Sequence, residues 1–298
     1  MPRIPKIVHY CFGFRQDFGG KPFRLSHYVC IRSAIERLQP EKVFLYYEFE
    51  PTGPWWDLIK GDITPVQITA PREIFGRPLS HPAHRSDITR LEKLIEHGGI
   101  YLDADVFVHR SMDALLDHST VIGREGEEED QKLCNAVLLA EPGAPFLRRW
   151  YGEYRDFRGT GPGLHWNEHS VVRPARLAAA HPDEITIESN KAFFWPLFFK
   201  RDLRLIFESD EPIVSDQTYA THLWENKAWH RYLSILTPGD VRRRDGNFYQ
   251  WARPYVEHLP DEFGEATALE KVENLRDLMR HEWRELSFRI NNRLRRSA

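Results

Sequence analysis

Cysteine is scarce in this chain of 298 residues, which holds only Cys11, Cys30 and Cys134. Three cysteines without CxxC spacing argue against a disulfide framework and against a cysteine-based zinc site. Long apolar runs are missing too, because none approaches the roughly 18–20 residues that a membrane-spanning helix needs. The opening segment, MPRIPK, lacks the apolar core of a secretory signal peptide. These absences together predict a cytoplasmic protein.

A strong excess of charge of either sign is missing as well. Lysine and arginine number 41 and aspartate and glutamate 44, so the formal net charge is −3. This balance argues against a nucleic-acid-binding protein, which usually carries a strongly basic surface. Hydrophobic residues make up 41% of the chain, enough for a sizeable core. No repeat or Pro/Ser-rich linker divides the sequence, so we expect one domain over residues 1–264 and a helical tail over 265–298.

Strand-like and helix-like segments alternate over the first third of the chain. Short runs of β-branched and aromatic residues predict strands, and apolar residues at steps of three and four predict helices. The expected strands cover 6–12, 42–47, 65–68, 100–102 and 133–140, and the expected helices cover 24–38, 55–59, 82–97, 145–154, 170–180 and 269–294. This pattern predicts an α/β fold with an open, largely parallel sheet, in which ligands bind at the carboxyl ends of the strands.

Two aspartates, Asp103 and Asp105, follow one of these expected strands. If the backbone there is extended, both carboxylates project to the same side. Like charges so close repel each other, and a divalent cation relieves that repulsion. Carboxylate oxygens suit Mg²⁺ or Mn²⁺. The alternative interpretation of the tripeptide alone is a turn capped by two aspartates.

The preceding helix carries a carboxylate on its apolar side. Stepping 100° per residue, Ile88, Leu91 and Ile95 define the buried arc, and Asp87 falls inside it. A carboxylate there is costly unless it is paired or bound to a ligand. Arg90 lies three residues further on and within reach. The pattern therefore predicts either a structural Asp87–Arg90 ion pair or a polar pair that holds a polyhydroxyl substrate.

These residues carry a family resemblance. The stretch from Arg85 to Asp105, RSDITRL followed by GGIYLDAD, resembles the DXD glycosyltransferases of family 32, a group related to toxin glucosyltransferase domains and to α-1,4-galactosyl and N-acetylglucosaminyl transferases. The segment IPKIVHY near the start is similar to the opening of the same group. The resemblance implies a GT-A-like fold with a Rossmann-type nucleotide-binding sheet, helical additions and a long C-terminal helix. Residues 1–140 would form the nucleotide-sugar half and residues 141–264 the acceptor half.

The resemblance also implies roles for individual residues. Asp87 and Arg90 match the pair that holds the donor sugar, Asp103 matches the contact to ribose and sugar, and Asp105 matches the metal ligand. The implied catalytic residues are Asp87, Arg90 and Asp103. The implied metal ligands, for Mn²⁺ or Mg²⁺, are Asp103, Asp105 and His222. The implied donor contacts are His9, Tyr10, Phe12, Asp87, Arg90, Tyr101, Asp103, Asn135 and Trp224. For His222 and Trp224, ordinary packing in the interior is the alternative interpretation.

The implied activity is metal-dependent transfer of a hexose from a UDP- or GDP-sugar to a glycan, lipid-linked or protein acceptor, with retention of configuration. A haloacid-dehalogenase-like phosphatase is one alternative, but Phe107 stands where that chemistry usually needs Thr or Val. A non-catalytic sugar-nucleotide-binding relative is the other, and the intact Asp87, Arg90, Asp103 and Asp105 argue against it.

The tail has an apolar stripe at steps of three and four residues, formed by Val272, Leu275, Met279, Trp283, Leu286, Ile290 and Leu294. From residue 276 to the end, seven arginines and three acidic residues leave a local net charge of +4. One interpretation is that the stripe packs on the rest of the chain or on a second copy in a homodimer. The other is a basic amphipathic helix at an anionic membrane surface, a peripheral contact near a lipid-linked acceptor.

Overall fold

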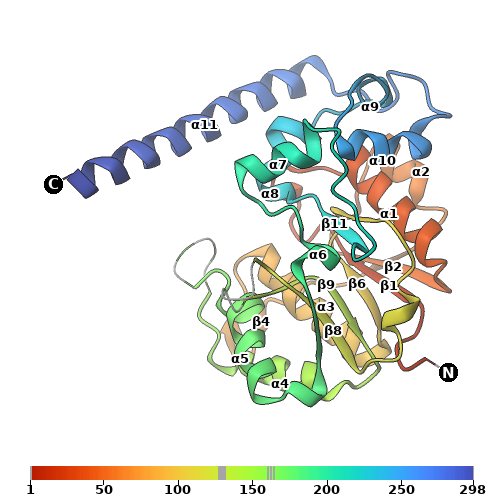
Figure 1. Cartoon of the computed structure of the whole chain (residues 1–298), viewed down its shortest axis with the longest axis vertical. Coiled ribbons are helices and arrows are strands. Elements are labelled where there is room, and N and C mark those ends of the chain that lie inside the picture. Colours follow the sequence, from red (N-terminus) through yellow and green to blue (C-terminus); the bar gives the residue numbers. More distant parts are fainter. Residues whose placement is uncertain (1, 127–131, 160, 162, 164, 298) are drawn as a thin grey trace.

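The computed structural model describes residues 2–126, 132–159, 161, 163 and 165–297, with side chains of the last helix described as far as Trp283. A seven-stranded sheet forms the centre of the protein, in the order β10-β8-β9-β6-β1-β2-β3 (Figure 1). The strands are β1 (Ile7–Cys11), β2 (Lys42–Tyr47), β3 (Thr64–Gln67), β6 (Gly99–Leu102), β8 (Thr120–Arg124), β9 (Leu133–Ala140) and β10 (Thr186–Glu188). In this sheet β9 runs antiparallel to β6 and β8, and the other pairings are parallel. The predicted α/β class is therefore confirmed.

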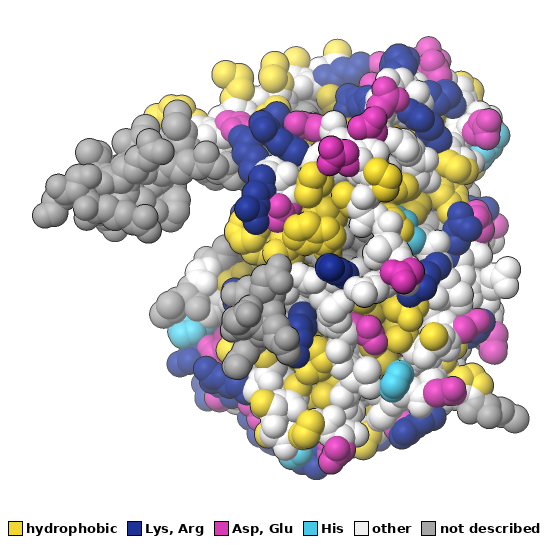
Figure 2. Space-filling view, in the orientation of Figure 1, with side chains coloured by type: hydrophobic (Ala, Val, Ile, Leu, Met, Phe, Trp, Pro, Cys, Tyr) yellow, Lys and Arg dark blue, Asp and Glu magenta, His cyan; other side chains and the backbone are white. Residues whose placement is uncertain are grey.

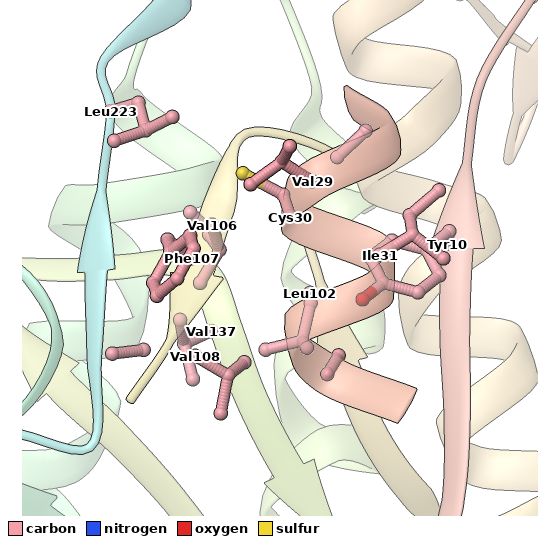
Figure 3. Packing of buried hydrophobic residues seen from close by; sticks show 14 of the residues in the cluster. Tyr10, Val29, Cys30, Ile31, Leu102, Val106, Phe107, Val108, Val137 and Leu223 are labelled. Carbon is pink, nitrogen blue, oxygen red and sulfur yellow. The ribbon is translucent and has the colours of Figure 1, made fainter. Parts of the chain in front are cut away.

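Helices cover both faces of this sheet and enclose two hydrophobic cores. One core lies beneath α1 (Leu25–Leu38), α2 (Pro54–Ile59) and α10 (Asn247–Val256), and part of it is shown in Figure 3. The other lies beneath α3 (Pro82–His97), α4 (Pro145–Gly152) and α5 (Arg173–Ala180). Because both faces are covered, the central strands β1 and β6 are apolar along most of their length rather than alternating.

The remaining elements lie around this sheet (Figure 1). They are the hairpin of β4 (Glu73–Ile74) and β5 (Arg77–Pro78), the pair β7 (Val106–Val108) and β11 (Ala220–His222), and the helices α6 (Asn190–Phe193), α7 (Lys200–Phe207), α8 (Glu225–Ala228), α9 (Pro238–Arg243) and α11 (Ala268–Ser297). In Figure 1, α7, α8, α9 and α11 lie in the upper part of the molecule, and β4 lies beside α5 in the lower part. Two helical turns, η5 (Glu168–Val172) and η7 (Trp229–Leu233), precede α5 and follow α8. Among the described residues, none of the helices combines the length and apolar character needed to cross a bilayer.

Two glycines place the end of α3 against β6. Gly98 and Gly99 have φ angles of +65° and +115°, in the region that favours glycine. A Cβ atom at Gly99 would lie 2.4 Å from the carbonyl oxygen of Ile7, and one at Gly98 would lie 2.6 Å from Pro142. The predicted stop of this helix is confirmed, and the close approach of β6 to β1 fixes the strand that leads to Asp103.

His9 on β1 serves the fold. In the neutral ring, Nε2–H donates to the carbonyl of Gly98 at 2.9 Å, and Nδ1 accepts from the Tyr46 hydroxyl at 3.1 Å. Burial lowers the pKa of His9 to about 4, and the nearby His97 and Lys93 act in the same direction. The folded protein therefore keeps His9 neutral at a pH where the unfolded chain, with an ordinary histidine pKa of about 6.5, is protonated.

We expect stability to fall on acidification between pH 6.5 and 4. In this window the unfolded chain binds a proton at residue 9 and the native chain does not. The contribution of His9 to the free energy of unfolding is therefore fully present above the pKa of the unfolded chain, and it is lost as the pH falls towards the pKa of the folded chain. The loss attributable to His9 approaches about 3 kcal/mol. Urea unfolding of wild type and His9→Gln at several pH values checks this, with the exposed His258→Gln as control. An unchanged pH slope in His9→Gln would contradict it.

Candidate active site

Asp103 and Asp105 lie in the turn that connects β6 to β7. The amide of Val106 donates to the carbonyl of Asp103 at 3.0 Å, so this backbone is a tight turn and not the extended segment expected from the sequence. The carboxylates still converge, because β7 pairs with β11 and sets Val106 opposite His222. Ligand atoms of Asp103, Asp105 and His222 all lie within 4.8 Å of one another. This group can hold a metal ion.

Backbone amides at the start of α8 hold Asp105 in place. The amide of Glu225 donates to Oδ2 of Asp105 at 2.7 Å, and the amide of Leu223 donates to its carbonyl at 2.9 Å. Trp224 between them has a φ of +55°, a left-handed conformation that turns the chain. The Glu225 carboxylate is in turn 2.6 Å from Nε2 of the buried His27 on α1. Asp105 is therefore fixed by residues from two distant parts of the chain.

The three groups differ in their tendency to ionise. Burial raises the pKa of Asp103, and the Asp105 charge adds to this, against the effect of Arg90. Burial also opposes ionisation of Asp105, but His222 and the Glu225 amide outweigh it and hold the pKa of Asp105 below its usual value. Burial lowers the pKa of His222, whereas Asp105 raises it with a larger net effect. In the described structure, 3.2 Å separates Nε2 of His222 from Oδ2 of Asp105.

Arg90 joins a second polar cluster, which contains Asp87 and Asn135, to the group of Asp103, Asp105 and His222. Its guanidinium donates to the carbonyl of Asn135 at 2.6 Å and lies 3.4 Å from Asp87 and 3.3 Å from Asp103. The Asn135 amide donates to Asp87 at 2.8 Å, and the Tyr101 hydroxyl donates to Asp103 at 2.8 Å. Burial raises the pKa of Asp87, but His84, Arg90 and Asn135 reverse this, so its net pKa is lowered. The predicted Asp87–Arg90 ion pair exists, and it extends to Asp103.

Both clusters open onto a cavity of about 530 Å³. It brings together eight of the residues implied by the sequence: Phe12, Asp87, Arg90, Asp103, Asp105, Asn135, His222 and Trp224. The structure does not bring His9, Tyr10 or Tyr101 to the cavity wall. His9 contacts Gly98 and Tyr46, Tyr10 lies in the core beneath α1, and Tyr101 lies behind Asp103. Phe12 reaches the cavity because it follows the last residue of β1.

Several residues of the cavity wall were not anticipated. His27, Glu225 and Lys227 line it on the side of α1 and α8, and His84 and Trp166 line it on the side of α3 and η5. The His84 and Trp166 rings contact each other with centroids 5.0 Å apart. His84, one turn before Asp87 on α3, could have been found from helical spacing. His27 lies on α1, Glu225 and Lys227 lie on the four-residue helix α8, which is too short to show a period, and Trp166 lies in a turn.

The family comparison agrees with this geometry. Residues 59–122 match the family described as a glycosyltransferase sugar-binding region containing a DXD motif. The chain is also 36% identical over 270 residues to glucan organizing enzyme 1 of Cryptococcus neoformans var. grubii, covering 87% of this chain and 72% of that protein. The chain belongs to the DXD glycosyltransferase family. The resemblance inferred from the sequence is thus confirmed, and the glycosyltransferase assignment replaces the phosphatase alternative.

Two further likenesses are more limited. An uncharacterized Arabidopsis thaliana protein, At4g19900, is 38% identical over 166 residues, which span 53% of this glycosyltransferase and 25% of the plant protein. A solved galactosyltransferase, LgtC in complex with donor and acceptor sugar analogs, has 14% identity and a TM-score of 0.44, covering 86% of this chain and 98% of that one. Asp87, Arg90, Asp103 and Asp105 of this glycosyltransferase fall inside the family segment, whereas His222 comes from outside it.

Proposed function

We propose that this glycosyltransferase moves a hexose from a nucleotide sugar to a hydroxyl of its acceptor with the help of Mn²⁺ or Mg²⁺. The observation that carries the proposal is the convergence of Asp103, Asp105 and His222 at a cavity that also contains the Asp87–Arg90–Asn135 cluster. Two carboxylates and an imidazole form a donor set that suits Mn²⁺, and Mg²⁺ is the alternative. When bound, such an ion would stabilise negative charge on the departing nucleoside diphosphate as a Lewis acid.

The protein's own groups would bind and orient the donor. Phe12 and His27 lie at the carboxyl end of β1 and the start of α1, where a nucleotide base and ribose would be held. Lys227 on α8 supplies a positive charge at the cavity wall for the diphosphate. Asp87 and Arg90 would hold the sugar hydroxyls in one orientation, which lowers the entropic part of the barrier.

We propose that the transfer retains the anomeric configuration without an enzyme nucleophile. Asp87 and Asp103 both contact the Arg90 guanidinium, and Asp87 also accepts from Asn135. A carboxylate held in this way is a poor nucleophile, which supports attack by the acceptor from the leaving-group side. Proton NMR of the glycoside formed would show whether its anomeric proton has the configuration of the donor sugar and so test the stereochemical course.

The acceptor classes are a glycan, a lipid-linked sugar or a protein. The name of the related glucan organizing enzyme 1 supports a glycan, and with it a part in polysaccharide biosynthesis. We also propose a cytoplasmic location, which is supported by three cysteines that are all free and buried. Contact through α11 with a second copy of the chain or with a membrane would complete the set of partners.

The function is tested by incubating the protein with UDP-glucose, UDP-galactose, UDP-N-acetylglucosamine or GDP-mannose in the presence of Mn²⁺. We expect nucleoside diphosphate to be released from one donor, and release to stop when a chelator is in excess. Thermal shift with the same donors is measured in parallel, because a true donor stabilises the fold by mass action. A donor that stabilises the protein without release would indicate the non-catalytic alternative, and neither effect with any donor would contradict the proposal.

A further inference from the structure

The long helix α11 contacts the body of the protein through polar side chains. The Glu270 carboxylate pairs with Arg24, and Asn274 accepts from the Ser234 hydroxyl at 2.7 Å. About two turns further on, Lys200 lies 2.9 Å from Glu282 and Arg231 lies 3.2 Å from it. These contacts define one face of α11 as its inner face and fix the direction in which the helix leaves the body, as Figure 1 shows.

The apolar stripe of α11 faces away from the body. Its described members fall within an arc of about 120° at 100° per residue, and they are Leu269, Val272, Leu275, Met279 and Trp283. All five are between 58% and 71% exposed. The interpretation that this stripe packs on the rest of the chain is therefore wrong for these residues. Leu286, Ile290 and Leu294, which continue the stripe in sequence, lie outside the described side chains.

The charges around the stripe distinguish between partners for it. Arg276 lies within its arc and Arg280 borders it, with side chains that are 55% and 61% exposed. The sequence carries a net charge of +4 over residues 284–298 and of −1 over residues 269–283, so a parallel pair of these helices would bring like charges together at the C-terminal end. In a seven-residue repeat, moreover, Arg276 shares the seam with Leu269 and Trp283, which is costly in a helix pair. At a lipid surface, an arginine can extend its guanidinium to the phosphates while its stem stays among apolar groups.

We propose that the stripe of Leu269, Val272, Leu275, Met279 and Trp283 is a docking surface for an anionic lipid bilayer. Leucine, valine and methionine would enter the boundary between headgroups and acyl chains, and tryptophan is enriched at that depth in membrane proteins. The basic residues of α11 would pair with lipid phosphates and carboxylates. Figure 2 shows Lys and Arg side chains gathered beneath α11, between the helix and a patch of apolar side chains on the body.

The active-site cavity adjoins α11 on its inner face, opposite the stripe. A groove between α11 and the body is lined by Leu278, His281 and Glu282 on the helix, and it shares Asn226 and Lys227 with the cavity. The docking surface and the cavity therefore lie on opposite sides of α11, and the docking proposal does not depend on the transfer reaction.

Sedimentation of the full chain with phosphatidylcholine vesicles, prepared with and without phosphatidylserine, tests the docking surface independently of any transfer reaction. We expect binding to the phosphatidylserine vesicles that weakens in high salt and falls about tenfold or more in the double variant Met279→Glu/Trp283→Glu. The control is Val214→Glu, an exposed apolar residue on the loop between α7 and β11. Because the stripe is exposed, the double variant should keep the wild-type melting temperature.

The other results overturn the proposal. If the full chain ignores phosphatidylserine vesicles at low salt, the stripe is not a membrane surface. If binding survives the double variant, the lipid contact lies elsewhere on the protein. Light scattering after size exclusion covers the remaining case, because a dimer that the double variant converts to a monomer would assign the stripe to a second copy of the chain.

Discussion

Asp105→Asn is expected to lower turnover of the nucleotide sugar by about 10²–10³-fold or more while the protein remains folded. Asparagine keeps the size of the side chain and an oxygen that can accept from the Glu225 amide, which lies 2.7 Å away in the wild type. It removes the negative charge from the group formed by Asp103, Asp105 and His222. The affinity for the metal should therefore fall, whereas the fold and its stability should stay unchanged.

Nucleoside diphosphate release over a range of Mn²⁺ concentrations measures this effect, and calorimetric titration with Mn²⁺ measures the affinity directly. The matched control is Asp216→Asn, which removes an exposed carboxylate from the loop before β11. If Asp105→Asn turns over the donor at the wild-type rate, the carboxylate is dispensable. If the wild-type protein keeps its full rate in excess chelator, the metal is dispensable.

Arg90→Lys is expected to reduce use of the intact nucleotide sugar by about a hundredfold and to change binding of the free nucleoside diphosphate much less. Lysine keeps the positive charge but loses the planar fork that reaches the Asn135 carbonyl, Asp87 and Asp103 together. It also loses the stacking of the guanidinium on Tyr101, where the distance to the ring centre is 4.3 Å. The sugar-binding end of the cavity should be affected most.

A purely structural role for Arg90 predicts a different pattern. Breaking a buried ion pair outright costs about 3–5 kcal/mol, and a strained substitute would lower the melting temperature and both affinities together. Arg110→Lys is the matched control, because Arg110 lies 4.0 Å from the ring centre of Tyr219 away from the cavity. Donor kinetics, calorimetry with the free nucleoside diphosphate and thermal unfolding of the two variants separate the roles.

The central part of the fold could be predicted from the sequence because its signals are local. The period of α3 identified Asp87 as a carboxylate on the buried side, and the Gly98-Gly99 pair gave the end of that helix. The antiparallel direction of β9 could not be predicted, because a strand buried on both faces is a continuous apolar run in either direction.

The site was predictable where its residues follow strand ends and less so elsewhere. Asp103 and Phe12 stand directly after β6 and β1, and both reach the cavity. His9 and Tyr10 stand within β1, where alternate side chains enter the two cores on opposite faces of the sheet. Trp166 comes from a turn and Glu225 from the four-residue helix α8, and the placement of such short elements depends on tertiary packing that no local pattern reveals.

The hydrogen bond from Glu225 to Asp105 joins residues 120 positions apart in the chain. The nucleotide half predicted over residues 1–140 contains the DXD turn but neither the imidazole of His222 nor the amide that holds Asp105. During synthesis, the carboxylate pair would therefore emerge long before the groups that complete it. Closing so long a loop costs conformational entropy, and a metal ion bound at the finished site would offset part of that cost in the native state. A bound ion would then link the two halves, so its removal should destabilise β11 and α8 before it affects the central sheet.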